Sequence, residues 1–81
     1  KYFLIGNTVD KTELYFNLNE AISEKKSLKI LYRNLNQEWQ ERVIHPLQMF
    51  CYGSKLYVTA FCELRDDIRH FEVDRIRIYR K

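Results

Sequence analysis

The sequence predicts a mainly β protein: a small antiparallel β-barrel with one short N-terminal helix. From Leu28 onward, apolar and polar residues alternate with a period of two, which is the pattern of half-buried strands. Short polar turns interrupt the alternation, as they do between consecutive short strands. The 81 residues include only 2 Gly and 1 Pro and are 46% hydrophobic, so the chain is one folded domain rather than a linker.

A short helix is expected from about Leu18 to Lys26. Asn17 is its expected N-cap, and Glu20, three residues later, is the capping-box partner. The apolar side chains of this segment share one narrow stripe, which is enough to dock the helix on the strands.

The segment before that helix is the least informative part of the chain. Residues 1–5 are either a short strand or a tail, and Gly6-Asn7 breaks the segment. We therefore expect residues 1–16 to be an N-terminal tail or linker and residues 17–81 to form the barrel domain. The chain begins at Lys1 rather than Met, as expected for a fragment of a longer protein.

Turn residues separate the expected strands. Asn34–Glu38 is a polar turn, His45-Pro46 interrupts the ladder because Pro cannot donate a hydrogen bond, and Gly53-Ser54 has the chemistry of a two-residue hairpin turn. The expected strands cover about residues 28–33, 39–44, 47–52, 55–62, 68–72 and 75–79, the last being a sixth strand or a continuation of the fifth.

The Gly53-Ser54 hairpin sets the register of two of these strands. One face pairs Cys51 with Leu56, Met49 with Val58 and Leu47 with Ala60, and we expect this wholly apolar face to be the core. The other face carries Gln48, Phe50 and Tyr52 opposite Thr59, Tyr57 and Lys55. Cys51 and Cys62 are not partners in this register, so no disulfide between them is expected.

Charge is unevenly distributed along the chain. The formal net charge is +3, and residues 1–27 are neutral overall, so the whole excess lies in residues 28–81. A basic surface of this kind attracts anions such as nucleic acid, and a merely solvated charged face is the alternative.

Several functional classes are not indicated. Cys51 and Cys62 have no metal-ligand spacing, so no metal site is expected. The chain has no glycine-rich phosphate loop and no His beside a nucleophile, so we expect neither an enzyme nor a cofactor. No apolar run is long enough to span a membrane, and the cysteine usage suits a reducing compartment, which predicts a cytoplasmic protein.

Three segments together resemble the WYL domain: LKILYR, ERVIHPL and KLYVTAFCELRDDIRHFEVDRI, which lie between Leu28 and Ile76. The closing run from Arg69 to Ile76 is the most specific part. The triplet that gives the family its name reads Leu56-Tyr57-Val58 here, so its Trp is replaced. Leu56 falls on the expected core face, which makes this a packing change.

The resemblance implies a Sm-like, SH3-type barrel that binds a ligand and regulates an attached domain. The ligand class it implies is nucleic acid, single-stranded DNA in particular, or a nucleotide-like anion. The WYL domain occurs in bacterial transcription regulators and at the end of some Pif-type helicases. The implied partner within the parent chain is therefore a helix-turn-helix or a helicase motor. A small-nucleotide sensor and a protein-interaction module remain the alternatives.

Four candidate ligand-binding residues match family positions: Tyr32, Arg42, Arg69 and Arg75. An arginine guanidinium forks onto a phosphate with two parallel hydrogen bonds, which is the chemistry such a ligand needs. The alternative for the arginines is ion pairing with Glu41, Glu72 or Asp74.

The remaining candidates are Trp39, His45, Lys55 and Tyr57. Tyr57, with its neighbours Phe50 and Tyr52, forms either a base-stacking platform beside Lys55 or a face buried under the helix. Trp39 is a contact residue or a partly buried rim aromatic. His45 is a phosphate donor or a turn residue.

Overall fold

A computed structural model of the chain describes residues 7–80. The elements are α1 (Lys11–Glu24), β1 (Leu28–Arg33), β2 (Trp39–Tyr52), β3 (Lys55–Cys62), β4 (Asp67–Glu72), the 3₁₀ turn η2 (Val73–Arg75) and β5 (Ile76–Arg77). Residues 1–5, expected to be a strand or a tail, lie outside the described part.

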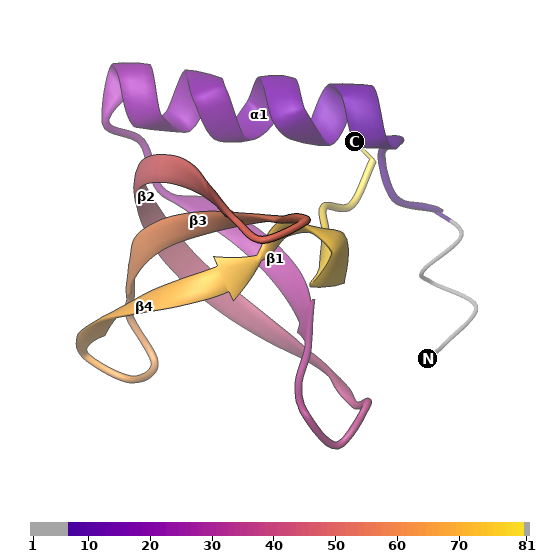
Figure 1. The fold of residues 1–81 in the computed structure, drawn as a ribbon. Coiled ribbons are helices and arrows are strands. Elements are labelled where there is room, and N and C mark those ends of the chain that lie inside the picture. Colours follow the sequence, from indigo (N-terminus) through magenta and orange to yellow (C-terminus); the bar gives the residue numbers. More distant parts are fainter. Residues whose placement is uncertain (1–6, 81) are drawn as a thin grey trace.

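The strands form one antiparallel sheet in the order β4-β3-β2-β1-β5, which confirms the mainly β class. The sheet is strongly curved, and α1 lies across one side of it (Figure 1). The β1–β2 and β3–β4 turns point away from the helix. The two edge strands of the sheet, β4 and β5, are not paired with each other within residues 7–80, so the barrel is open rather than closed.

The helix begins earlier than the sequence analysis expected. Asp10, not Asn17, is the N-cap, and its carboxylate accepts a hydrogen bond from the backbone N–H of Glu13 at 2.9 Å. The Asp10–Glu13 pair repeats the capping-box spacing of Asn17–Glu20 about two helical turns earlier, so the longer helix keeps the same inward face. Residues 11–16, assigned above to the tail, are therefore helical.

The helix ends at Glu24 because Lys25 takes the left-handed conformation (φ 56°) and donates its backbone N–H to the carbonyl of Ala21. Lys26, expected to be the last helical residue, lies outside the helix and pairs with Glu24 at 2.8 Å. That hydrogen bond and the negative charge of Glu24 raise the pKa of Lys26.

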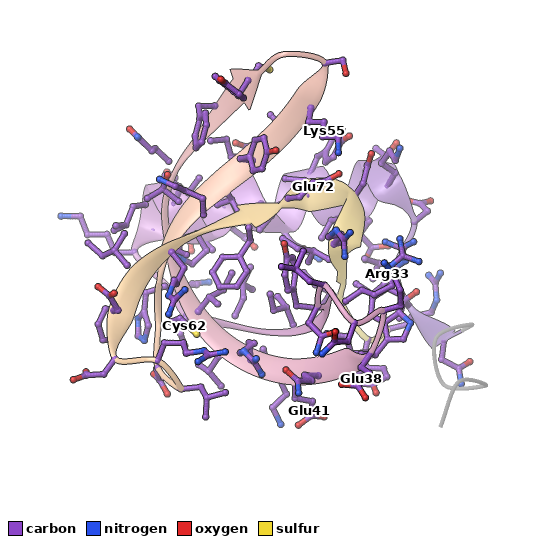
Figure 2. The ribbon with its side chains drawn as sticks, turned by 60° about the horizontal axis from the view of Figure 1, so that its bottom comes forward. Arg33, Glu38, Glu41, Lys55, Cys62 and Glu72 are labelled. Carbon is purple, nitrogen blue, oxygen red and sulfur yellow. The ribbon has the colours of Figure 1, made fainter. Side chains whose placement is uncertain are left out.

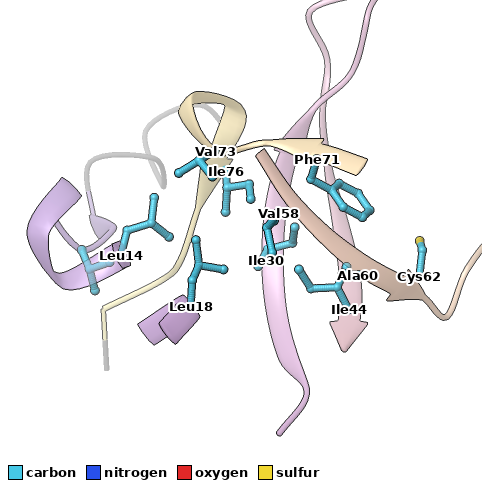
Figure 3. Packing of buried hydrophobic residues seen from close by; sticks show 11 residues of the cluster. Leu14, Leu18, Ile30, Ile44, Val58, Ala60, Cys62, Phe71, Val73 and Ile76 are labelled. Carbon is cyan, nitrogen blue, oxygen red and sulfur yellow. The ribbon is translucent and has the colours of Figure 1, made fainter. Parts of the chain in front are cut away.

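The hydrophobic core lies between α1 and the concave face of the sheet. Leu14 and Leu18 point toward Ile30, Val58 and Ile76, all of them buried (Figure 3). Cys62 and Phe71 occupy the end of the core that is farther from the helix.

β2 is one continuous strand, so the expected break at His45-Pro46 is wrong. A register shift between Pro46 and Gln48 accommodates the proline, because a bulge is a position at which a ladder hydrogen bond is not needed. Pro46, rather than Leu47, lies opposite Ala60, and Leu47 is half exposed. The expected Leu47–Ala60 core pair is therefore also wrong.

The hairpin at Gly53 is confirmed. Gly53 has a positive φ of 61°, and Tyr52 pairs with Lys55 on either side of the turn. The register of the following pairs is also as expected, with Cys51 opposite Leu56, Met49 opposite Val58 and Phe50 opposite Tyr57. Cys51 is exposed, however, so the hairpin tip extends beyond the core. Cys51 and Cys62 are both free thiols.

The C-terminal end differs from the expected sixth strand. Residues 73–75 form η2, and only Ile76 and Arg77 pair with β1. Tyr79 contributes an isolated bridge to Thr8. The buried Val73 and Ile76 explain the change, because η2 turns the chain so that both side chains enter the core.

Candidate functional site

A groove of about 330 Å³ opens at the end of the curved sheet that is farther from α1 (Figure 2). Its walls come from the end of β1 and the following turn, from β2, from the β3–β4 turn and from β4 and η2. The lining residues are Tyr32, Arg33, Asn34, Leu35, Arg42, Cys62, Arg65, Arg69, His70, Phe71 and Arg75. Cys62 and Phe71 connect the groove to the hydrophobic core.

The groove is lined by five arginines and by no Asp or Glu. Two other hollows of the described surface are balanced. One is lined by Asp10, Lys11, Asp74 and Arg77 among others, and the second by Lys29, Glu41, Arg42 and Glu63. An excess of positive charge in a concave site concentrates the field and attracts anions. The arginine groove is therefore the strongest candidate anion site among these three.

The sheet register explains how two of the arginines reach the groove. Arg42 pairs with Ile30 and Arg69 pairs with Ala60, and cross-strand partners share a face. Both arginines therefore project from the concave face that carries the core. They lie where the core ends, so Arg42 is partly exposed and Arg69 is exposed.

Arg75 is held by the protein itself. One guanidinium nitrogen, Nη1, donates to the carbonyls of Arg33 at 2.8 Å and Asn34 at 2.9 Å. Nε lies 3.5 Å from a carboxylate oxygen of Glu72. The ion-pairing alternative thus applies to Arg75 through Glu72, whereas Asp74 pairs with Lys11 at 3.5 Å. Arg75 clamps η2 to the end of β1.

Arg42 forms hydrogen bonds along its own strand. Its Nη2 donates to the side-chain oxygen of Gln40 at 2.6 Å, and its Nη1 donates to the backbone carbonyl of Glu41 at 3.0 Å. These exposed contacts orient the guanidinium without neutralising its charge, because neither acceptor is a carboxylate.

Arg65 and Arg69 are the two groove arginines without a partner in the described part of the chain. Within residues 7–80 neither side chain has a hydrogen bond or an ion pair with another residue. Their guanidinium groups are therefore available to a ligand. Arg65 was missed in the sequence analysis because it lies in the β3–β4 turn, and alternation of side chains does not predict where a turn residue points.

Arg33 and His70 also line the groove and were also missed. Arg33 lies over the Trp39 ring, 5.7 Å from its centre, and its buried Nε has no hydrogen-bond partner in the described residues. Figure 2 shows Arg33 and Cys62 on opposite sides of the opening. Arg33 is flanked by the turn that Arg75 clamps, so this wall of the groove is held from two directions.

Tyr32 forms part of the wall. Its hydroxyl accepts a hydrogen bond from the backbone N–H of Glu72 at 3.1 Å. Its ring packs edge-on against Phe71, with 5.0 Å between ring centres. Four expected site residues therefore meet in one groove: Tyr32, Arg42, Arg69 and Arg75.

Trp39 and His45 do not line this groove. Trp39 is partly buried, and the guanidiniums of Arg33 and Arg77 lie 5.7 and 5.4 Å from its ring centre. This is the arrangement of the rim aromatic considered above. His45 is bound by Nε2 to a carboxylate oxygen of Glu63 at 2.7 Å, so this nitrogen already has a partner.

Lys55 and Tyr57 lie on the outer face of the sheet. The ammonium of Lys55 is 3.6 Å from a carboxylate oxygen of Glu72. Tyr57 stacks on Phe50, with ring centres 5.3 Å apart and planes 14° apart. The buried residues of α1 pack with Val58, whose side chain points to the opposite face from Tyr57. The helix therefore does not cover the aromatic pair.

Among residues 7–80 no three His, Cys, Asp or Glu side chains gather closely enough to hold a metal ion. In the same part of the chain, no helix has the length and apolar character that crossing a membrane requires.

The fold and the sequence both have known relatives. Residues 13–80 match the model of the WYL domain family. The chain is similar to the uncharacterized HTH-type transcriptional regulator YobV of Bacillus subtilis (strain 168), with 26% identity over 72 residues, covering 89% of this chain and 23% of that protein. It is also similar to the proteasome accessory factor B/C (PafBC) of Arthrobacter aurescens, with a TM-score of 0.75 and 29% identity over 80% of this chain and 10% of PafBC.

The chain thus spans less than a quarter of the length of either relative. The family match, in contrast, extends from the first turns of α1 to residue 80, and it includes every strand and every wall of the arginine groove. The resemblance read from the strand and arginine motifs is confirmed: the chain belongs to the WYL domain family.

Proposed function

We propose that this WYL domain is a non-catalytic regulatory module that binds single-stranded DNA through the arginine groove and thereby modulates an attached domain. The observation that carries the proposal is a groove lined by five arginines and no carboxylate, in which Arg65 and Arg69 have no partner among residues 7–80. Guanidinium groups match the geometry of a phosphate, which they bind through paired hydrogen bonds.

The shape of the site favours a single strand over a duplex. Proteins read duplex DNA by inserting a helix or a ribbon into the major groove, which needs a protruding element. This site is a hollow, and flexible single strands can place individual nucleotides into a hollow. The apolar part of the lining, Leu35 and the edge of Phe71, suits the sugar or base beside a bound phosphate.

The relatives support a regulatory setting. YobV is an HTH-type transcriptional regulator, and PafBC is a proteasome accessory factor. The similarity to YobV favours a helix-turn-helix as the attached domain over the helicase motor that the family also allows. Binding in the groove can reach such a domain through the β1–β2 turn, because Arg75 ties that turn to η2.

A small nucleotide-like ligand is the second candidate. The volume of about 330 Å³ lies at the lower end of the range typical of small-molecule sites. A mononucleotide would use the same two free guanidiniums, so the two candidates differ in ligand length and not in position.

Fluorescence anisotropy with a labelled oligothymidylate tests the proposal. Arg69→Gln should weaken binding by about tenfold or more, the usual effect of losing a charge-assisted hydrogen bond. Arg69→Lys should also weaken it, because an ammonium cannot form the paired bonds.

Lys25→Gln is the matched control. It removes the same charge just after the C-terminal end of α1, where Lys25 is exposed and does not line the groove. Equal losses from Arg69→Gln and Lys25→Gln, with unchanged melting temperatures, would mean that diffuse charge alone attracts the DNA and that the groove is not the site.

A further inference from the structure

His70 lies where the arginine groove meets the outer face of the sheet. It lines the groove, and its ring also packs edge-on against Phe50, with 5.2 Å between ring centres. Its Nδ1 lies 3.0 Å from the hydroxyl oxygen of Thr59 on the neighbouring strand, which holds the ring in place. His70 is therefore shared between the groove and the outer face of the sheet.

The edge strand β4 separates these two surfaces. Arg69 and His70 are consecutive on β4, and consecutive side chains of a strand point to opposite faces. Arg69 lies on the groove side, and the stacked Phe50–Tyr57 pair lies on the outer side beyond His70. β4 has no strand beyond it in residues 7–80, so a ligand can pass over this edge without displacing a neighbour.

We propose that a bound strand crosses β4, with one phosphate at Arg69 in the groove and the base of the next nucleotide stacked on the Phe50–Tyr57 pair. This rests on the proposed function and deepens it, because it makes the minimal ligand a dinucleotide rather than a mononucleotide. Phe50 lies on the second strand from β4, which corresponds to about 10 Å. The base of the nucleotide whose phosphate is bound by Arg69 falls short of that separation, and the base of the next nucleotide along the strand reaches it.

The charges around the aromatic pair favour this occupant. Lys55, the cation beside Tyr57, is paired with Glu72, so the aromatic pair offers stacking surface beside a cation that already has a partner. The groove offers free guanidiniums and little exposed ring surface. A nucleic-acid strand has both parts that these surfaces bind, a phosphate and a planar base, one nucleotide apart.

Calorimetric titration with dTMP, the dinucleotide pdTpdT and a hexathymidylate tests the inference on the wild-type chain and on two variants, Tyr57→Leu and Phe50→Leu. Base stacking on a ring typically contributes about tenfold in affinity. The wild-type chain should therefore bind pdTpdT about tenfold more tightly than dTMP. Both variants should lose this gain while binding dTMP as the wild type does. Tyr52→Leu is the control, since Tyr52 is 76% exposed at the hairpin tip and outside the stack.

Two results would overturn the inference. One is equal affinity of the wild-type chain for dTMP and pdTpdT. The other is a gain from the second nucleotide that persists in both Tyr57→Leu and Phe50→Leu. In either case Arg69→Gln would still weaken binding of every ligand if the groove is the anion site. An Arg69→Gln variant that binds all three ligands as the wild type does would instead refute the proposed function itself.

Discussion

The hydroxyl of Tyr32 accepts a hydrogen bond from the backbone N–H of Glu72 at 3.1 Å, and this bond joins β1 to β4 across the open side of the sheet. The two strands are not neighbours in the sheet order. The edge-on contact of Tyr32 with Phe71 adds a second link between the same strands. Tyr32 therefore holds two walls of the groove at a set separation.

Tyr32→Phe should lower stability without removing the ring contact. The Glu72 N–H loses its partner in a half-buried position, which costs about 1 kcal/mol. For a domain of this size, that corresponds to a fall in Tm of roughly 4–8 °C. Tyr52→Phe, at an exposed site, is the control for thermal unfolding and should leave Tm unchanged. Equal Tm values for Tyr32→Phe and the wild type would show that the bond contributes nothing.

Substitution of Arg75 should lower the stability of the fold, whereas substitution of Arg69 should affect ligand binding and leave stability nearly unchanged. Arg75→Ala removes hydrogen bonds to two carbonyls and the pairing with Glu72, so it should destabilise the fold by about 2 kcal/mol. Arg69→Ala removes no hydrogen bond or ion pair within residues 7–80 and should change stability by less than about 0.5 kcal/mol. Urea unfolding measures both values. A larger loss of stability for Arg69→Ala than for Arg75→Ala would contradict these roles.

The revised helix position can be tested by truncating one buried and one exposed side chain of α1. Leu18 has no exposed surface, and Leu18→Ala should cost about 2–5 kcal/mol because it leaves a cavity. Phe16 is 64% exposed, so Phe16→Ala should cost much less despite removing more atoms. Denaturant midpoints that rank the two variants in the opposite order would mean that α1 packs on another face.

His45 should be dispensable for DNA binding. Its Nε2 is bound to Glu63, and the residue does not line the arginine groove. His45→Gln should therefore leave the affinity for oligothymidylate within about twofold, because exposed ion pairs contribute roughly 0–1 kcal/mol and only to the fold. An anisotropy titration in which His45→Gln lowers the affinity for oligothymidylate tenfold would mean that His45 contributes to DNA binding.

The strands were the most predictable part of the fold. Residues 28–33 and 55–62 have the predicted bounds, because alternation and the Gly53 turn are local signals. The helix start and the His45-Pro46 break were mispredicted because each depends on the core. Burial of Leu14 selects the Asp10 cap over an equivalent later one, and the bulge after Pro46 lets β2 continue.

The candidate site was predictable in position more than in role. The WYL-like motifs predicted four residues that the fold brings to one groove, although they are distant in sequence. The partners of Arg75 could not be predicted, since its bonds go to carbonyls about forty residues away. Arg65 and His70 line the groove because of the geometry of the β3–β4 turn and of the edge strand β4. Local sequence patterns do not predict that geometry.

The salt dependence of DNA binding tests the central claim most directly. Phosphate contacts by Arg65, Arg69 and the un-neutralised Arg42 predict a slope of about −2 for log K against log salt, at roughly −0.7 for each contact on a single strand. Arg69→Gln should reduce the slope to about −1.4, because one contact is removed, whereas Lys25→Gln should keep the wild-type slope. A flat dependence for the wild-type chain, or the same reduction in both variants, would contradict a specific phosphate site in the arginine groove.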